Sequence, residues 1–101
     1  MEKSTPHTPL HVMQDLAKAG KVRTTMTSLA TAAALNMGVD DMVRTVLQMT
    51  MADFYKSMTV NTDSSRWQDV YHAKSPIGML YVKLQLDNGA VNMKIVSFKE
   101  K

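Results

Sequence analysis

The chain has 101 residues, 45% of them apolar, and its 12 lysines and arginines outnumber its 9 aspartates and glutamates for a formal net charge of +3. This length suits one well-packed domain and is too short for two, so we expect a single domain over residues 1–101. The absence of cysteine excludes disulfides, thiolate nucleophiles and cysteine-ligated metal centres and favours the cytosol; we expect neither a signal peptide nor a membrane-spanning helix.

The first half of the chain shows the spacing of helices. Thr8-Pro9 suits a helix start, an apolar stripe follows, and Gly20 suits a stop, which predicts a helix over roughly 8–19. The short segment 21–24 looks extended. Three more helical segments are predicted from capping residues and apolar spacing: one from Thr25 or Thr27 to near Gly38, one opened by Asp40 or Asp41, and a short turn over Met51–Tyr55, capped by Thr50 and ending beside Lys56.

The second half changes to the alternation of strands. Strands are predicted at 58–60, 67–71, 77–86 and 90–99, and Asp87-Asn88-Gly89 predicts a hairpin between the last two. Helices followed by antiparallel strands predict an α+β domain, with the N-terminal helices packed on one face of a twisted antiparallel sheet. The segment 77–86 puts leucines and Val82 on one face and Tyr81 and Lys83 on the other.

The excess of positive over negative charge lies in the second half of the chain. Basic and acidic residues balance up to residue 55, whereas seven basic residues face four acidic ones from residue 56 on. This distribution would attract a polyanion such as RNA, although charge alone favours the simpler interpretation of a solvated lysine surface. The basic residues of this half are Lys56, Arg66, Lys74, Lys83, Lys94, Lys99 and Lys101.

The residues that carry chemistry are few. The three histidines lack metal-ligand spacing, so no metal site is expected, and no phosphate-binding loop or nucleophile elbow is present. Lysine, tyrosine and glutamine on the polar face can supply what RNA cleavage by the neighbouring 2′-hydroxyl requires: a proton acceptor, a proton donor and charge around the phosphate. Spacing alone leaves catalysis open, because each of these residue types is more often structural or solvated.

Several uncommon strings together resemble the MqsR toxins, bacterial mRNA interferases with a RelE-like fold. They are Met1-Glu2-Lys3, Thr5-Pro6-His7-Thr8, Val22-Arg23-Thr24-Thr25, Asp53-Phe54-Tyr55-Lys56-Ser57-Met58-Thr59, Trp67-Gln68-Asp69-Val70-Tyr71 and Val96-Ser97-Phe98-Lys99-Glu100-Lys101. The resemblance runs along the whole chain, with residues 26 to 50 matching mainly in pattern.

The resemblance implies a function and a partner. MqsR toxins cleave mRNA at GC-containing triplets such as GCU without a ribosome, and an MqsA-like antitoxin neutralises them; we expect no cofactor and a monomeric free toxin. The family's catalytic set falls on Lys56, Gln68, Tyr81 and Lys99. Arg23, Arg66 and Lys83 are the further cations expected to bind RNA. A ribosome-dependent interferase of the RelE type and a non-catalytic RNA-binding module remain the alternatives.

The register of the last hairpin decides whether this set shares one face. A two-residue loop at Asn88-Gly89 would pair Leu86 with Val91, Leu84 with Met93 and Val82 with Ile95. Continued regularly, that ladder would leave Tyr81 and Lys99 on opposite faces. We therefore predict a β-bulge between about Val91 and Ser97, which turns Lys99 to the side of Tyr81.

Overall fold

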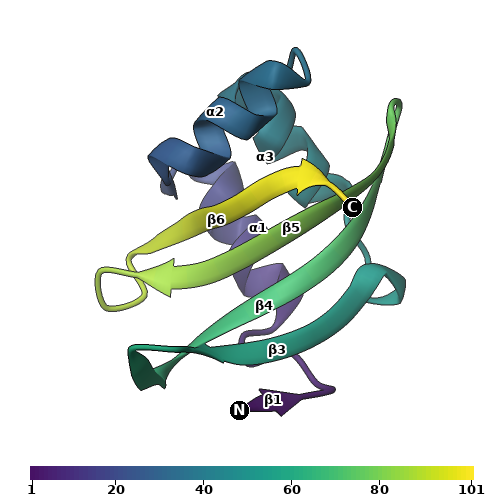
Figure 1. The fold of residues 1–101 in the computed structure, drawn as a ribbon. Coiled ribbons are helices and arrows are strands. Elements are labelled where there is room, and N and C mark those ends of the chain that lie inside the picture. Colours follow the sequence, from purple (N-terminus) through teal and green to yellow (C-terminus); the bar gives the residue numbers. More distant parts are fainter.

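The computed structural model describes residues 1–101 and contains one six-stranded sheet (Figure 1). Its strands are β1 (Glu2–Lys3), β2 (Val22–Thr24), β3 (Phe54–Val60), β4 (Asp63–Ser75), β5 (Gly78–Asp87) and β6 (Asn92–Glu100). They lie in the order β1-β3-β4-β5-β6-β2; β2 runs parallel to β6, and every other pair is antiparallel. The four predicted strands are therefore confirmed, and the extended segment 21–24 joins the same sheet as β2.

The predicted helices are present, but not every predicted capping residue is confirmed: Pro9, and not Thr8, precedes the first helix, and no side chain caps it. The helices are α1 (Leu10–Lys18), α2 (Met26–Ala34), α3 (Val39–Gln48) and the 3₁₀ turn η1 (Met51–Asp53). Thr25 caps α2 by accepting a hydrogen bond from the Ser28 amide at 3.0 Å, and the Asp41 carboxylate accepts one from the Gly38 amide at 2.9 Å. The turn ends earlier than predicted, because β3 already begins at Phe54.

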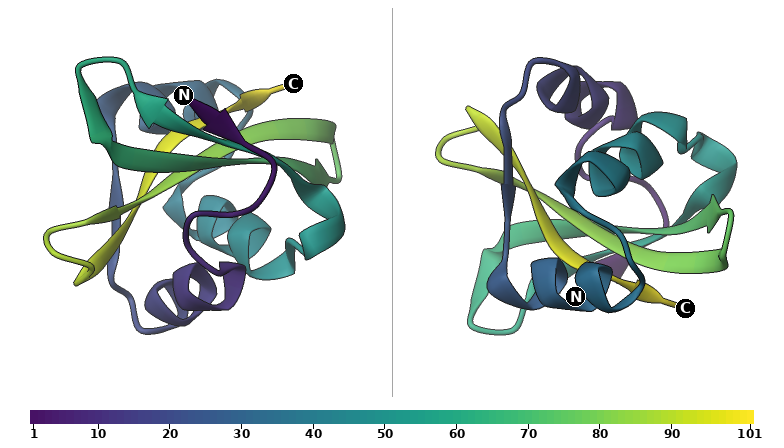
Figure 2. Two further views of the ribbon diagram at one scale, coloured as in Figure 1. Left: turned by 90° about the horizontal axis from the view of Figure 1, so that it is seen from below. Right: turned by 90° about the horizontal axis from the view of Figure 1, so that it is seen from above.

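Helices α1 and α3 cover one face of the sheet and leave the other face open (Figures 1 and 2). Both helices present an apolar stripe to the sheet, and the strands answer with alternate apolar side chains. The fully buried core between them includes Met13, Met42, Val46, Tyr71, Leu80, Val82, Leu84, Met93, Ile95 and Phe98. None of the helices is long and apolar enough to cross a membrane. The α+β class with helices on one sheet face is thus confirmed.

Helix α2 lies along the edge of β6 instead of on the face, beginning where the short strand β2 ends. Its side chains satisfy the backbone of β6: the Ser28 hydroxyl donates to the Ile95 carbonyl at 3.0 Å, and the Thr31 hydroxyl donates to the Phe98 carbonyl at 2.6 Å. Covering an edge in this way removes hydrogen-bonding groups that could otherwise pair with another chain.

The predicted bulge is present. In the β5–β6 ladder Leu84 pairs with Ile95, whereas Lys83 pairs with Ser97, so Val96 is the extra residue. The Thr25 hydroxyl donates to the Val96 carbonyl at 2.9 Å, so the cap residue of α2 also fixes the bulge. From the bulge onward the ladder places Lys99 opposite Tyr81 on the open face.

The prediction of a two-residue hairpin loop is wrong. Residues 88–91 form a four-residue loop, and Leu86 pairs with Met93 and Leu84 with Ile95. Asn88, Gly89 and Ala90 all have positive φ, of 52°, 62° and 69°, so the left-handed stretch extends one residue beyond the Asn-Gly pair. The observed register differs from the expected one by two residues, which returns every side chain to the same face. Facial alternation therefore supports both registers equally.

A buried carboxylate joins the N-terminal segment to the sheet. Asp69 accepts hydrogen bonds from the backbone amides of His7 and Thr8, both at 3.0 Å, and from the Ser57 hydroxyl at 2.6 Å. Its side chain is on the helix side of β4, beside the core residues. These contacts fix the path that leads from β1 to α1.

Candidate active site on the open face of the sheet

The open face is a grid of side chains in which each row crosses neighbouring strands. One row consists of Tyr55, His72, Tyr81 and Lys99, from β3 to β6. The next row consists of Lys56, Val70, Lys83 and Ser97. A third row consists of Met58, Gln68, Gln85, Lys94 and Arg23, and it reaches β2.

Three of the four residues expected to be catalytic lie in the first two rows. Tyr81 and Lys99 are direct cross-strand partners, and the Lys99 ammonium lies 5.2 Å from the centre of the Tyr81 ring. Lys56 comes from β3 in the second row. Gln68 is in the third row, where its amide nitrogen donates to the Gln85 side-chain oxygen at 2.8 Å. The structure thus brings Lys56, Tyr81 and Lys99 together and leaves Gln68 at the border of the group.

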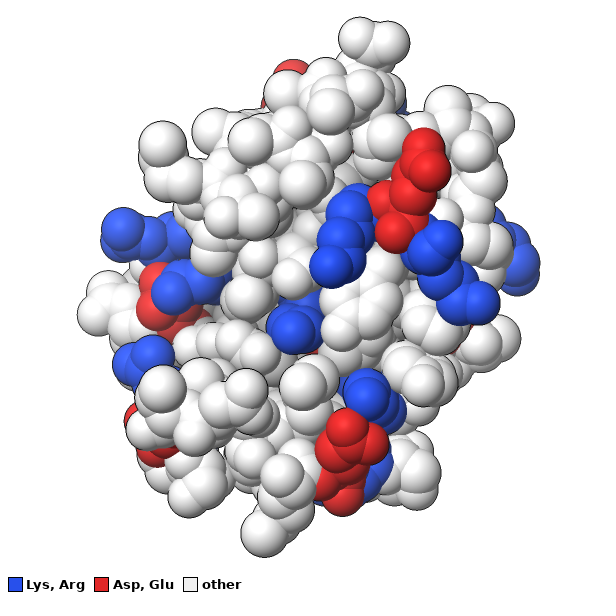
Figure 3. Space-filling model, in the orientation of Figure 1, with Lys and Arg blue, Asp and Glu red and all other residues white.

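Lys83 is at the centre of this group. Its ammonium lies 5.9 Å from the centre of the Tyr81 ring, and Lys56 and Lys99 are in the rows and strands around it. Burial, followed by the charges of Lys99 and Lys56, lowers the pKa of Lys83 below the usual lysine range. Neither Lys83 nor Lys99 forms an ion pair with a carboxylate. Together with Lys56, these two cations make this part of the face attractive to a phosphate. In Figure 3, basic side chains lie apart from one another over the middle of the open face.

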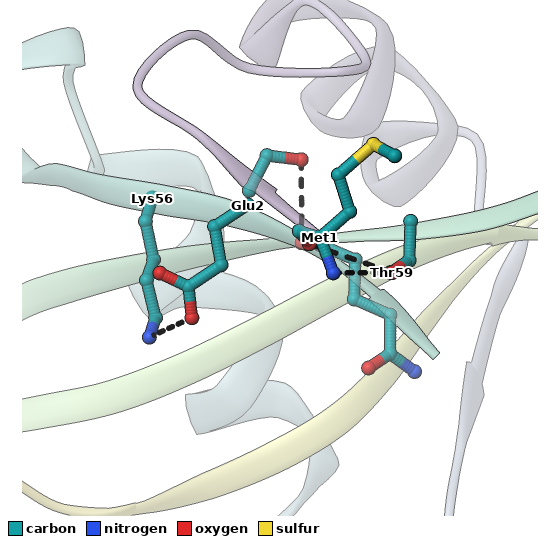
Figure 4. A network of polar contacts seen from close by, with 6 residues as sticks. Met1, Glu2, Lys56 and Thr59 are labelled. Carbon is teal, nitrogen blue, oxygen red and sulfur yellow. Dashed lines mark hydrogen bonds and ion pairs between the residues drawn. The ribbon is translucent and has the colours of Figure 1, made fainter. Parts of the chain in front are cut away.

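The ammonium group of Lys56 is held by a carboxylate on β1, a strand that contributes no residue to the three rows. The Glu2 carboxylate, on β1, accepts a hydrogen bond from the Lys56 ammonium at 2.8 Å (Figure 4). This hydrogen bond raises the pKa of Lys56, which therefore keeps its charge, and lowers the pKa of Glu2. Because β1 pairs with β3 at Met58 and Ser57, the carboxylate is carried by the sheet itself.

Arg23 and Arg66 lie at the other end of the face. They line a polar pocket together with Thr24, Thr25, Asp87, Asn88 and Lys94. Asp87 contacts the cations of Arg23 at 3.6 Å and Lys94 at 3.7 Å. The three residues expected to bind RNA therefore separate, with Lys83 in the central group and the two arginines in this pocket. In Figure 3 this second basic group is on the left, over the hairpin ends of the strands, with acidic atoms among the basic ones.

Sequence reasoning missed three parts of this face. His72 and Tyr55 extend the row of Tyr81, and Lys94 lines the pocket with the arginines. The predicted strand 67–71 stopped one residue before His72, whereas β4 continues to Ser75. A longer strand would have placed His72 on the face of Gln68 by alternation alone. No group of three or more histidine, aspartate or glutamate side chains has the arrangement of a metal site.

The chain is similar in sequence to known proteins along its whole length. Residues 5–100 match the model of a family described as "Motility quorum-sensing regulator, toxin of MqsA". The chain is also 43% identical over 101 residues to "mRNA interferase toxin MqsR" of Escherichia coli (strain K12), and the alignment covers 100% of both chains.

Proposed function

The chain belongs to the MqsR toxin family, and from this premise we propose that it is the toxin of a type II toxin–antitoxin system and an endoribonuclease that cleaves mRNA. One observation carries the proposal: Lys56, Tyr81, Lys83 and Lys99 gather on one open face in a chain that matches an mRNA interferase from end to end. A protein antitoxin like MqsA is the proposed partner, since the family description names that protein.

The proposed reaction is attack of a 2′-hydroxyl on the neighbouring phosphorus. A 2′-O–P bond forms and the P–5′-O bond breaks, which gives a 2′,3′-cyclic phosphate and a free 5′-hydroxyl. One proton leaves the attacking oxygen and one reaches the leaving oxygen. We assign Lys56 and Lys99 to phosphate binding and to stabilising charge on the pentavalent phosphorus. Gln68 orients the phosphate or the attacking hydroxyl, and Tyr81 exchanges a proton with the substrate.

The RNA strand is proposed to continue from the central group toward the pocket of Arg23 and Arg66. Lys83 binds the phosphate nearest the scissile bond. The third row of the grid, through Gln85 and Lys94, connects the two basic regions without leaving the open face. A flexible single strand can follow such a track, and we propose cleavage at GC-containing triplets such as GCU.

We further propose that cleavage needs neither a metal ion nor a ribosome, because lysine and tyrosine side chains supply charge and proton transfer directly. The test is to incubate purified protein with a GCU-containing RNA in the presence of EDTA and without ribosomes. We expect cleavage that leaves a 2′,3′-cyclic phosphate, and expect Tyr81→Phe, Lys56→Ala and Gln68→Ala each to reduce its rate.

Lys18→Ala is the matched control, because Lys18 is exposed at the end of α1, on the helix side of the molecule. Cleavage that appears only with ribosomes would identify an interferase of the RelE type instead. Salt-dependent RNA binding without cleavage would identify a binding module. An unchanged rate in a variant that combines all three substitutions would reject the catalytic assignment.

A further inference from the structure

His72 lies in the first row of the open face, beside Tyr81, and it belongs to no metal site. On β4 it is the direct cross-strand partner of Tyr81, and the centres of the two rings are 6.2 Å apart. On its other side the imidazole stacks on the Tyr55 ring, with centres 4.3 Å apart and planes 24° from parallel. Tyr55 therefore holds the imidazole through its ring face, beside the proposed site of reaction.

Both ring nitrogens of His72 are free of hydrogen bonds to the protein. His7 shows the contrast: its Nδ1 lies 3.0 Å from the Lys3 ammonium, and its ring stacks on Trp67. His11 is exposed on α1, among the helices. Of the three histidines only His72 combines a fixed ring, unengaged nitrogens and a place on the open face.

The charged groups that share this part of the face with His72 are lysines, two of which, Lys56 and Lys74, pair with the carboxylates of Glu2 and Asp53. The titratable groups that share its part of the face are Tyr55 and Lys56 on β3, Tyr81 and Lys83 on β5, Lys99 on β6, Lys101 beyond it, and Lys74 on its own strand. Burial and then the charge of Lys101 lower the pKa of His72 below its usual value near 6.5. The imidazole is therefore neutral at pH 7, the form that accepts a proton.

We propose that His72 is a further catalytic residue, which accepts the proton of the attacking 2′-hydroxyl while Tyr81 donates a proton to the leaving 5′-oxygen. This inference rests on the proposed function. Each step is balanced: the 2′-hydroxyl proton passes to a ring nitrogen, the 2′-oxygen bonds to phosphorus, and the phenolic proton passes to the 5′-oxygen as its bond to phosphorus breaks. A proton returns from His72 to Tyr81 through solvent before the next turnover.

The neighbouring residues explain why the imidazole takes this role. Lys56 is held protonated by Glu2, which suits it for binding a phosphate and not for accepting a proton. The phenolic hydroxyl of Tyr81 is a hydrogen-bond donor, which suits Tyr81 for giving a proton to the leaving oxygen. An imidazole suits the role of acceptor, because histidine is the side chain that ordinarily gains and loses a proton near neutral pH. Adjacent positions on β4 and β5 allow the two groups to reach the two apical oxygens of one phosphorus.

The first test is the pH dependence of kcat/KM for GCU-containing RNA. The parent is expected to lose activity as the pH falls through the pKa of His72, because the imidazole becomes protonated. His72→Gln is expected to lose this acidic limb and to lower kcat about 100-fold or more. His11→Gln is the matched control and is expected to keep both the limb and the rate. An acidic limb that persists in His72→Gln overturns the inference.

The second test separates the acceptor from the donor. In an RNA whose scissile 5′-oxygen is replaced by sulfur, the leaving group needs no proton. We expect this substrate to restore the rate of Tyr81→Phe and to leave the defect of His72→Gln unchanged. Restoration in His72→Gln would make His72 the donor and overturn its role as acceptor. Free imidazole is expected to raise the rate of His72→Ala in proportion to its concentration, which a purely structural residue would not show.

Failure of this inference is distinct from failure of the proposed function. A parent that produces no 2′,3′-cyclic phosphate overturns the proposed function. A parent that does so, beside a His72→Gln variant within about threefold of its rate, overturns only the role of His72. Thermal melting of each variant, compared with the parent, shows that the same folded protein is being measured.

Discussion

The Glu2 carboxylate lies 2.8 Å from the Lys56 ammonium, so the outermost strand of the sheet holds a cation that we assign to the scissile phosphate. A phosphate that approaches Lys56 must compete with this carboxylate. The contact therefore keeps Lys56 charged and positioned, and it also reduces the attraction that the open face exerts on RNA.

Substituting Glu2→Gln is expected to tighten RNA binding. Without the carboxylate, Lys56 is free to pair with phosphate, so KM for a GCU-containing RNA should fall a few-fold while the loss of the ion pair leaves the fold intact. Asp15→Asn on α1 is the control, since it removes the same charge from an exposed position on the helix side. Equal effects of the two substitutions would mean that only net charge matters. The measurement is KM at low ionic strength.

Lys83→Met is expected to stabilise the protein and weaken RNA binding. The pKa of Lys83 is lowered, so between that pKa and about 10.5 the folded state binds fewer protons than the unfolded state and stability rises with pH. Below this window the charge is a cost, which the substitution removes; because Lys83 is partly exposed, the gain at pH 7 is about a few tenths of a kcal/mol. Urea unfolding at pH 7 and pH 10 measures it.

The same Lys83→Met protein should bind RNA with a salt dependence whose slope is smaller by about one, since one phosphate contact is lost. Lys18→Met is expected to change neither quantity. If the Lys83→Met variant were less stable than the parent at pH 7, the charge of Lys83 would not destabilise the folded protein.

Deleting Val96 is expected to abolish activity and to destabilise the fold. Without the extra residue the β5–β6 ladder becomes regular, which turns Lys99 toward the helices and the buried Phe98 toward solvent. Exposing a core phenylalanine costs about 2–4 kcal/mol. Inserting one glycine after Gly89 is the control, because it lengthens only the hairpin loop, and activity should be retained. Circular dichroism melting measures the stability of each variant, and the cleavage assay measures its activity. An active Val96 deletion would contradict the observed register of β5 and β6.

Asp69→Ala is expected to destabilise the protein by about 2–4 kcal/mol, because it leaves buried donors without partners. These donors are the amides of His7 and Thr8 and the hydroxyl of Ser57. Asp63→Ala removes two hydrogen bonds to Ser65 at an exposed position and should cost much less. Denaturant unfolding distinguishes the two, and equal losses would show that burial of Asp69 is unimportant.

Arg23→Gln is expected to raise KM for long RNAs and to leave kcat unchanged. The pocket that it lines with Arg66 and Lys94 is away from Tyr81, so it contributes to binding and not to the chemical step. The parent should prefer RNAs that extend beyond the cleaved triplet, and the variant should lose this preference. Arg44→Gln, on α3, is the control. A lower kcat on a minimal RNA would place Arg23 in the reaction instead.

The sequence predicted most of the fold because capping residues and alternation are local signals. Thr25 and Thr50 mark helix starts that the structure confirms, whereas α3 begins at Val39, ahead of the expected Asp40 or Asp41. The hairpin register depends on Ala90, whose positive φ extends the loop and has no signal of its own. Reaching Lys99 opposite Tyr81 required a shift of three residues from the expected ladder: the longer loop supplies two and the bulge at Val96 supplies one.

The site was predicted less completely, for a different physical reason. The family resemblance gave four residues, and the structure gathers Lys56, Tyr81 and Lys99, but the roles of these residues remain predictions. His72 was not predicted, because the histidines of the sequence show only that metal-ligand spacing is absent. The stacking of His72 on Tyr55 depends on the irregular pairing between Phe54 and Lys56. Contacts across four strands are set by register, which a linear pattern does not contain.

The order of the strands has a consequence for synthesis. The proposed catalytic residues come from four successive strands, and β6, which carries Lys99, lies between β5 and β2 inside the sheet. Strand β2 and helix α2 therefore have no partner until residues 92–100 have left the ribosome and can pair. Without residues 92–100 the face that carries Lys56, Tyr81 and Lys99 is not assembled, so the proposed cleavage requires β6 to have left the ribosome and paired with β5.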